Sequence, residues 1–270
     1  MQNNAGMQRK LDVGATLNQI FSAYGAHAGV LLPVAFGLYL IVSIVTALLA
    51  GSLVFFLLAW AVSVVAATLY QGMVVSLVRD VQDGQRDSSV GELIEEAMPV
   101  ILPLIGAGIL AGLGIALGLI LLIVPGLILM TIWAVIAPVI VVEHSGVIDA
   151  FGRSRELVRD HGWQVFGVIF VVGLIAFVAS IVLGIVGASI TDSVAGRIIF
   201  NLIASTLTAP LTALAAATIY FNLLAIKGEG TPAAAGYGEV PPPPPGATPP
   251  PPPAAPGPPP PPAPPAPPAV

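Results

Sequence analysis

The 39 residues from Leu104 to Val142, "LIGAGILAGLGIALGLILLIVPGLILMTIWAVIAPVIVV", contain no charged side chain. As a single helix this stretch would be about 59 Å long, roughly twice the thickness of the hydrocarbon core of a bilayer. It therefore predicts two membrane spans joined by a turn. We place the turn at "VPG", residues 124–126, because Pro125 is tolerated at the start of a helix and Gly126 accepts turn dihedral angles.

The composition of the whole chain is that of an integral membrane protein. Of its 270 residues, 56% are hydrophobic and 9% are charged, whereas charged residues make up about a quarter of an ordinary soluble domain. The net charge of −5 and the lack of a long basic stripe give no reason to expect nucleic acid as a partner. With no cysteine, the chain has no disulfide, thiolate or cysteine-based metal chemistry.

Six stretches are long and apolar enough to cross a bilayer as helices. They predict an all-α integral membrane protein with six transmembrane helices arranged as three hairpins. The expected domains are an N-terminal cytoplasmic segment (1–28), a six-helix membrane domain (29–226) and a disordered, proline-rich cytoplasmic tail (227–270). The spans lie near residues 29–49, 53–78, 104–123, 125–142, 165–187 and 198–226.

The positions of Lys and Arg predict the orientation of the chain. With the N-terminus inside, only Arg197 lies outside, and the other eight basic residues lie inside. Cytoplasmic loops carry such an excess of basic residues, so both termini are expected in the cytoplasm of a multi-pass plasma-membrane protein. The eight are Arg9, Lys10, Arg79, Arg86, Arg153, Arg155, Arg159 and Lys227.

Each pair of spans is preceded by a segment whose apolar residues recur at helical spacing, near residues 13–24, 90–97 and 147–158. Asp12 is placed to cap the first segment. The three openings, "DVGATL", "SVGELI" and "SGVIDA", are similar. One interpretation is a threefold repeat of an interfacial amphipathic helix followed by a hairpin. The alternative is that any loop beside a bilayer becomes amphipathic.

The third segment gathers an unusual number of polar groups in "VVEHSGVIDAFGRSRELVRDHGWQVFG", residues 141–167. On a helical wheel, Asp149, Gly152, Arg153, Glu156 and Asp160 share one face. Arginine suits bidentate contact with phosphate. One hypothesis is that anionic lipid headgroups are held by Arg153, Arg155, Arg159, His161 and Trp163. The alternative is that these arginines set the topology and Trp163 marks the headgroup level.

Residues from about 100 to 190 resemble the glycerophosphoryl diester phosphodiesterase membrane domain family and related bacterial membrane proteins. The matching positions are Pro125, Gly126, Trp133, Pro138, Val142, Glu143, Ala150, Arg153, Ser154, Glu156, Leu157, Gly162, Trp163, Phe166 and Gly167. In the enzymes that carry this domain, hydrolysis belongs to a separate soluble barrel. The resemblance therefore implies a multi-span accessory domain and carries over no catalytic residue.

The sequence offers little for catalysis, and we expect neither an enzyme nor a bound metal or cofactor. The three histidines are far apart in sequence, without the helical pairing of a zinc site. Glu143 beside His144 is the best acid/base candidate, although a cap or interface role is the alternative. Glu92, Glu95 and Glu96 could ligate a cation, or they could begin a solvated helix.

Small residues and prolines interrupt the predicted spans. Gly108, Gly112, Gly114 and Gly118 allow close approach of helices, either within the bundle or at a dimer face. The prolines at positions 33, 103, 138 and 210 could break helices around a substrate, as in some transporters. They keep open the alternative of a transporter or channel for lipid-like or small uncharged solutes.

The tail contains proline runs from Pro241 to Pro268. As an extended polyproline helix it would reach on the order of 90 Å. It is either a ligand for the aromatic groove of a cytoplasmic protein or a passive spacer. The leading hypothesis from the whole sequence is a non-enzymatic integral membrane module that engages membrane lipid headgroups or organises partners at the cytoplasmic face.

Overall fold

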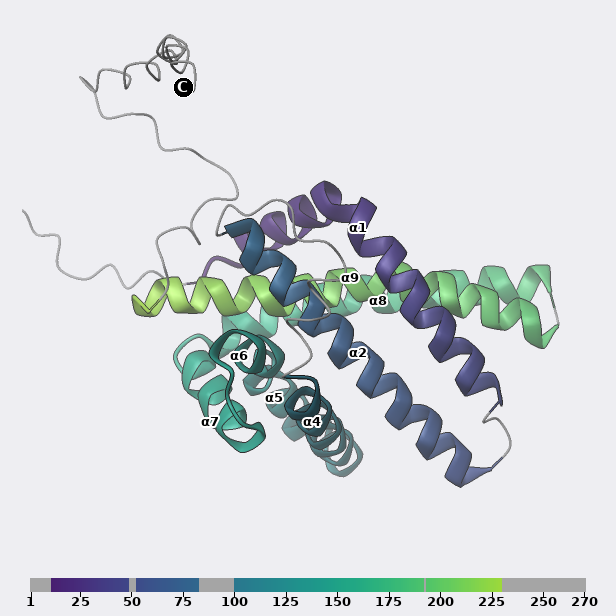
Figure 1. Ribbon diagram of the computed structural model, residues 1–270, viewed down its shortest axis with the longest axis horizontal. Coiled ribbons are helices and arrows are strands. Elements are labelled where there is room, and N and C mark those ends of the chain that lie inside the picture. Colours follow the sequence, from purple (N-terminus) through teal and green to yellow (C-terminus); the bar gives the residue numbers. More distant parts are fainter. Residues whose placement is uncertain (1–10, 49–51, 83–99, 192, 230–270) are drawn as a thin grey trace, which may run out of the picture. The chain divides into compact units, whose positions relative to one another are not determined.

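The computed structural model describes residues 11–48, 52–82, 100–191 and 193–229, and every regular element in these ranges is a helix (Figure 1). This confirms the all-α class. The helices are α1 (Val13–Leu48), α2 (Leu53–Gln82), α4 (Ile101–Leu121), α5 (Ile123–Ile132), α6 (Ile136–Glu143), α7 (Val147–Val158), α8 (Gly162–Ile190) and α9 (Val194–Lys227).

Among the described residues, six segments are long and apolar enough to cross a membrane. Five of these segments correspond to all or most of one helix each: α1, α2, α4, α8 and α9. The sixth, Ile123–Glu143, is made of α5 followed by α6. Their number and order agree with the six predicted spans. The chain is therefore a multi-pass membrane protein.

The N-terminal part of the chain differs from the prediction. The sequence predicted a separate amphipathic helix before the first span, but α1 runs unbroken for 36 residues. The predicted cap is confirmed, since Asp12 Oδ1 accepts a hydrogen bond of 2.9 Å from the amide of Ala15. Gly25, Gly29 and Pro33 do not end the helix, and α1 accommodates all three in its interior. The second predicted amphipathic segment, near residues 90–97, lies outside the described residues.

The turn between the third and fourth spans lies slightly before the predicted "VPG". Leu122 has an extended backbone between α4 and α5, so Pro125 falls in the first turn of α5. There a missing amide hydrogen removes no bond of the helix. A Cβ on Gly118 would lie 3.0 Å from the Cα of Gly126, and a Cβ on Gly126 would lie 2.6 Å from the amide nitrogen of Leu119. Both glycines therefore let the backbones of α4 and α5 approach closely.

The fourth span is not one continuous helix, as the prediction of a single span over 125–142 implied. It is interrupted between Ile132, the last residue of α5, and Ile136, the first residue of α6. Pro138 lies in the first turn of α6, where it breaks no internal bond. The interruption frees main-chain groups that need other partners.

Helix α9 forms the centre of the bundle and contacts α1, α2, α6, α7 and α8. Its second half carries the run "ALAAATIYF", in which small alanines allow neighbouring helices to approach. Leu214, Ile219, Tyr220 and Leu223 are fully buried there. Asn222 reaches across to α1, donating to Gln19 Oε1 at 3.0 Å and to Thr16 Oγ1 at 3.3 Å.

Candidate functional site

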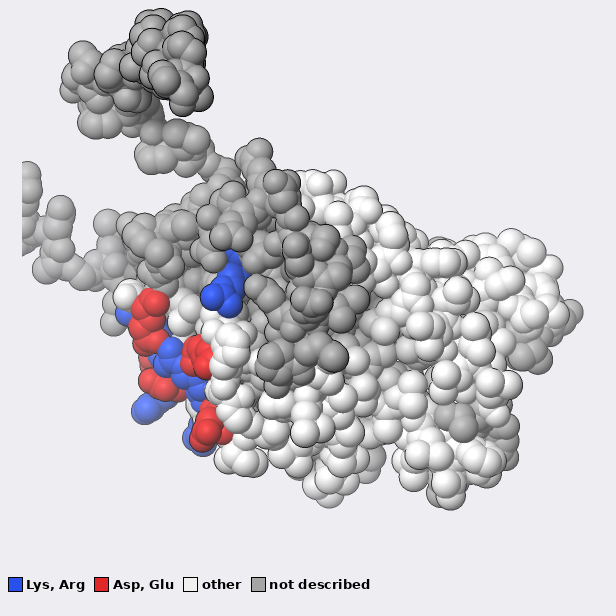
Figure 2. Space-filling view, in the orientation of Figure 1, with Lys and Arg blue, Asp and Glu red and all other residues white. Residues whose placement is uncertain are grey.

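Charged side chains gather at one end of the described helices. Figure 2 shows red and blue atoms over α7 and the adjoining ends of α6 and α9, with one separate blue patch beside the grey atoms, whereas the remaining described surface in this view is white. The same end holds the polar segment that the sequence analysis singled out. The candidate site is therefore centred on α7.

Helix α7 packs on the protein through one face, formed by Ala150, Ser154, Leu157 and Val158. Ser154 Oγ donates a hydrogen bond of 2.8 Å to the main-chain oxygen of Ile132, which the interruption between α5 and α6 leaves free. The ring of Phe151 meets that of Trp133 edge to face, with centroids 4.9 Å apart. The sequence predicted an interfacial helix, whose apolar face would lie against lipid. The apolar face of α7 is instead buried against the bundle.

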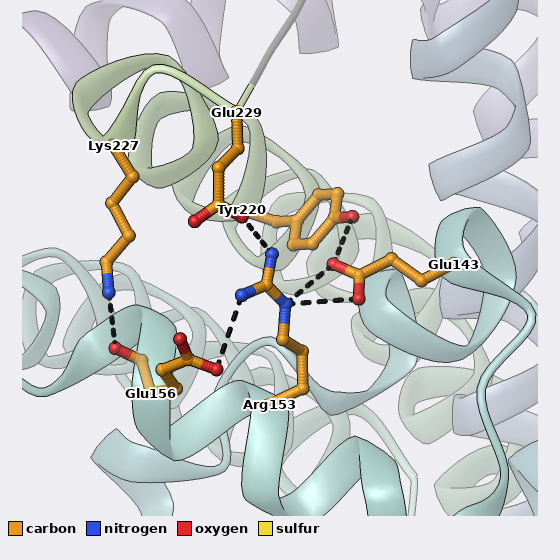
Figure 3. A network of polar contacts seen from close by, with 6 residues as sticks. All are labelled: Glu143, Arg153, Glu156, Tyr220, Lys227 and Glu229. Atoms are coloured by element: carbon orange, nitrogen blue, oxygen red, sulfur yellow. Dashed lines mark hydrogen bonds and ion pairs between the residues drawn. The ribbon is translucent and has the colours of Figure 1, made fainter.

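Arg153 is surrounded by carboxylates of the same chain (Figure 3). Its Nε donates to both oxygens of Glu143, at 3.2 and 3.1 Å, and one terminal nitrogen donates to Glu156 at 3.3 Å. The other terminal nitrogen pairs with Glu229. We call these residues, together with Tyr220 and Lys227, the Arg153 cluster.

Two further contacts complete the Arg153 cluster. Tyr220, whose side chain is buried in α9, donates its hydroxyl hydrogen to Glu143 at 3.0 Å. Lys227 Nζ donates to the main-chain oxygen of Glu156 at 2.7 Å. The cluster thus joins the end of α6, the middle of α7 and the end of α9.

The surroundings of Arg153 fix its charge. Partial burial lowers the pKa of its guanidinium, but the hydrogen bonds and charges of Glu229 and Glu143 outweigh this and raise it. The side chain is 23% exposed. Because its donors face protein carboxylates, Arg153 does not fit the predicted role of holding a lipid headgroup.

The Arg153 cluster also fixes the end of α9. Gly228 has a left-handed backbone with φ of 73°. Its amide donates to Ala225 O at 3.3 Å and the amide of Glu229 donates to Leu224 O at 3.0 Å, which is the Schellman arrangement for ending a helix. Glu229, which the sequence assigned to the tail, is thus held by its backbone and by its side chain, and the first proline run begins 12 residues later at Pro241.

Arg155 and Arg159 occupy a different side of α7. With Ile148 and Gly152 they fall within about 60° on a helical wheel, and we call these four residues the basic strip. All four are exposed. Among the described residues neither arginine has an ion-pair partner. Ile148 is 71% exposed, so the strip combines an uncovered apolar side chain with two uncovered cations.

The other two predicted headgroup residues differ from each other. Trp163, in the first turn of α8, is 84% exposed and meets Phe166 edge to face at 6.0 Å. His161 lies between α7 and α8, and its Nδ1 is buried with no hydrogen-bond partner among the described residues. Trp163 therefore lies on the surface, close in sequence to the basic strip, whereas one side of the His161 ring is turned inward.

The candidate acid/base pair is not assembled as a pair. The carboxylate of Glu143 is bound by Arg153 and Tyr220, while His144 takes a left-handed backbone, with φ of 52°, that ends α6. In the described ranges no group of three or more His, Asp and Glu residues could hold a metal ion. Glu92, Glu95 and Glu96 lie outside those ranges.

The four predicted packing glycines of α4 face other helices. A Cβ would lie 2.3 Å from Thr68 Oγ1 at Gly108, 3.2 Å from the Trp60 ring at Gly112 and 2.7 Å from the Trp133 ring at Gly114. Gly118 meets Gly126, as described above. These contacts are all within the chain, so they correspond to packing within the bundle rather than to a dimer face.

A cleft of about 240 Å³ opens between α8 and α9, away from the Arg153 cluster along both helices. It is lined by Ser180, Gly184, Gly187, Ala188, Phe200, Asn201, Ala204 and Ser205. Small side chains leave this space, and Asn201 contributes an amide to it. The cleft could admit a small solute between these two spans.

Sequence reasoning missed three residues of the site. Glu229 was assigned to the tail, Tyr220 to an apolar span and Ser154 to an apolar face. The hydroxyls of Tyr220 and Ser154 were the available signal, because buried hydroxyls have hydrogen-bond partners. Comparison of the chain with protein-family models, with curated proteins and with solved structures found no match.

Proposed function

We propose that this protein is a non-enzymatic integral membrane module that holds anionic lipid headgroups at its cytoplasmic face and presents its proline-rich tail from a fixed point on that face. The observation that carries the proposal is the division of the arginines of α7. Arg153 is bound by Glu143, Glu156 and Glu229, whereas Arg155 and Arg159 are exposed.

The basic strip has the composition of a surface that meets the polar boundary of a membrane. Exposed arginines beside an exposed isoleucine can extend their stems along apolar surface and direct their guanidinium groups to phosphates. Trp163 follows at the start of a long apolar helix, where tryptophan is enriched near headgroups. The proposal uses the orientation predicted from the positions of Lys and Arg, in which α7 and both termini lie in the cytoplasm.

The Arg153 cluster supports the second half of the proposal. It ties Glu229, the last described residue, to α6 and α7. A tail that starts from a fixed point can present a polyproline ligand to a cytoplasmic partner within a limited distance of the membrane. The resemblance to the glycerophosphoryl diester phosphodiesterase membrane domain family implies an accessory role. Four of the positions that carry this resemblance make packing or ion-pair contacts within the chain, namely Trp133, Glu143, Arg153 and Ser154.

Native mass spectrometry tests the lipid half of the proposal. The wild-type chain is compared with an Arg155→Gln/Arg159→Gln variant, and Arg153→Gln is the matched control on the same helix. We expect the double variant to lose bound phosphatidylglycerol while the wild type and the control retain it. Equal retention by all three proteins would contradict a headgroup site at the basic strip.

Transport of lipid-like or small uncharged solutes is a second candidate function, favoured by the interrupted fourth span and by the cleft between α8 and α9. Flux of a solute panel into proteoliposomes tests it. Transport that is abolished by Asn201→Leu would favour this function, and no flux above that of empty liposomes would remove it.

A further inference from the structure

Aromatic side chains form a line on the surface of α8 that none of the contacts described so far explains. Trp163, Phe166, Phe170 and Phe177 fall within about 60° of one another on a helical wheel. The buried residues Val165, Val168 and Val172 lie on the opposite side. We call the four aromatic residues the aromatic stripe.

Three of the four residues of the aromatic stripe are exposed, and Phe166 is half-buried. Phe170 is 52% exposed and Phe177 is 62% exposed, in addition to the exposed Trp163. The first three rings touch one another in order, because the centroids of Phe166 and Phe170 are 5.6 Å apart and Trp163 meets Phe166. These three rings therefore form a continuous aromatic surface, and Phe177 lies about two helical turns further along the same face.

The length and position of the stripe match one acyl chain. From Trp163 to Phe177 the helix rises about 21 Å, somewhat more than one leaflet of a hydrocarbon core about 30 Å thick. Trp163 lies in the first turn of α8, and tryptophan at the end of a membrane span is typical of the headgroup level. Arg159, the last residue of the basic strip, precedes Trp163 by four residues, so their Cα atoms lie within about 14 Å.

We propose that an anionic phospholipid binds with its phosphate at Arg155 and Arg159 and with one acyl chain along Trp163, Phe166, Phe170 and Phe177. This inference rests on the proposed function and adds to it the residues that contact an acyl chain of the bound lipid. The arginines favour this occupant, because Arg155 and Arg159 precede Trp163 by eight and four residues and, in the described ranges, form no ion pair with the exposed acidic residues of α7. An uncharged or zwitterionic lipid gains less from the same arginines.

Photocrosslinking tests the site with the full-length protein in bilayers. The probe is phosphatidylglycerol with a diazirine in one acyl chain, and phosphatidylcholine with the same chain is the reference. We expect the phosphatidylglycerol probe to label the stripe residues of α8. The phosphatidylcholine probe should label lipid-facing residues of α4 and α8 without preference.

Two variants separate the headgroup from the chain. In Arg155→Gln/Arg159→Gln, labelling of the stripe by phosphatidylglycerol should fall about tenfold, to the level of the reference. In Phe166→Leu/Phe170→Leu/Phe177→Leu, native mass spectrometry should still detect bound phosphatidylglycerol, while the labelling spreads over α8. Ile175→Leu/Val182→Leu, which alters exposed residues on another side of α8, should keep the wild-type pattern.

Three results would overturn the inference. In the first, the wild type retains phosphatidylglycerol but the probe labels the bundle without preference. This result would exclude the acyl-chain site and leave the proposed function standing. No retention by the wild type would remove both. Crosslinks between two copies of the chain through the stripe would show that the surface is covered by protein and not by lipid.

Discussion

Ser154 of α7 donates its hydroxyl hydrogen to the main-chain oxygen of Ile132, the last residue of α5, at 2.8 Å. The bond joins two residues that are 22 positions apart and lie on either side of α6. It satisfies a carbonyl freed by the interruption of the fourth span. The docking of α7 and the interruption of that span are therefore one structural feature.

Replacing Ser154 by alanine should consequently destabilise the bundle. The variant leaves the buried carbonyl of Ile132 without this donor, a loss of about 1–3 kcal/mol. Thermal unfolding in detergent should show a lowered midpoint. Ser180→Ala is the control, because Ser180 donates within its own helix to Ala176, and its midpoint should not change. Equal midpoints for the two variants would contradict the role of Ser154.

Glycine at position 126 should be required for the turn between α4 and α5. A Cβ there would lie 2.6 Å from the backbone nitrogen of Leu119, so Gly126→Ala should cost about 1–3 kcal/mol through overpacking. In Gly173→Ala the new Cβ meets nothing within 4 Å. This control should be neutral or stabilising by up to about 1 kcal/mol, and the unfolding midpoints of the two variants measure the difference.

The amide contacts of Asn222 should couple α9 to α1. Asn222→Ala removes its donors to Gln19 and Thr16, and hydrogen bonds between membrane helices contribute about 0.6–1.7 kcal/mol. A double-mutant cycle with Gln19→Ala isolates that part of the effect. We expect a coupling energy of this size, and additive effects of the two substitutions would show that the pair does not interact.

Breaking the Arg153 cluster should release the residues at the end of α9. In Arg153→Gln, Glu229 loses its ion pair, and the amide of Glu229 should exchange with solvent faster than in the wild type. Amides in the middle of α9, such as that of Leu214, should be unaffected. Arg155→Gln should leave the exchange of the Glu229 amide unchanged, and acceleration in both variants would point to a general loosening of α7.

Much of this fold could be predicted because apolar length is a strong signal. A run of 39 uncharged residues must cross a membrane twice, and the prolines that follow the turns at Leu122 and Val135 lie where helices begin. The division of α1 into two helices was wrong, because amphipathic spacing at residues 13–24 also fits a helix whose polar residues bond to α9, as Thr16 and Gln19 do.

The candidate site was less predictable, since it is assembled from residues distant in sequence. Periodicity placed Arg153, Arg155 and Arg159 on one helix but gave no sign that Glu229, 76 residues further on, pairs with the first of them. The same limit applies to Tyr220 and Glu143, which are 77 residues apart. Pairing across the bundle depends on tertiary packing, which helical spacing does not encode.

The most direct test of the central claim is to measure which arginines lie near phosphate when the protein is embedded in phosphatidylglycerol bilayers. Solid-state NMR can record dephasing of the arginine Cζ signals by ³¹P, with Arg153→Lys and Arg155→Lys/Arg159→Lys variants to assign them. We expect strong dephasing of arginine Cζ signals by ³¹P in the wild type and in Arg153→Lys. This dephasing should be lost in the Arg155→Lys/Arg159→Lys variant. Dephasing that depends on Arg153, with none from Arg155 or Arg159, would contradict the central claim.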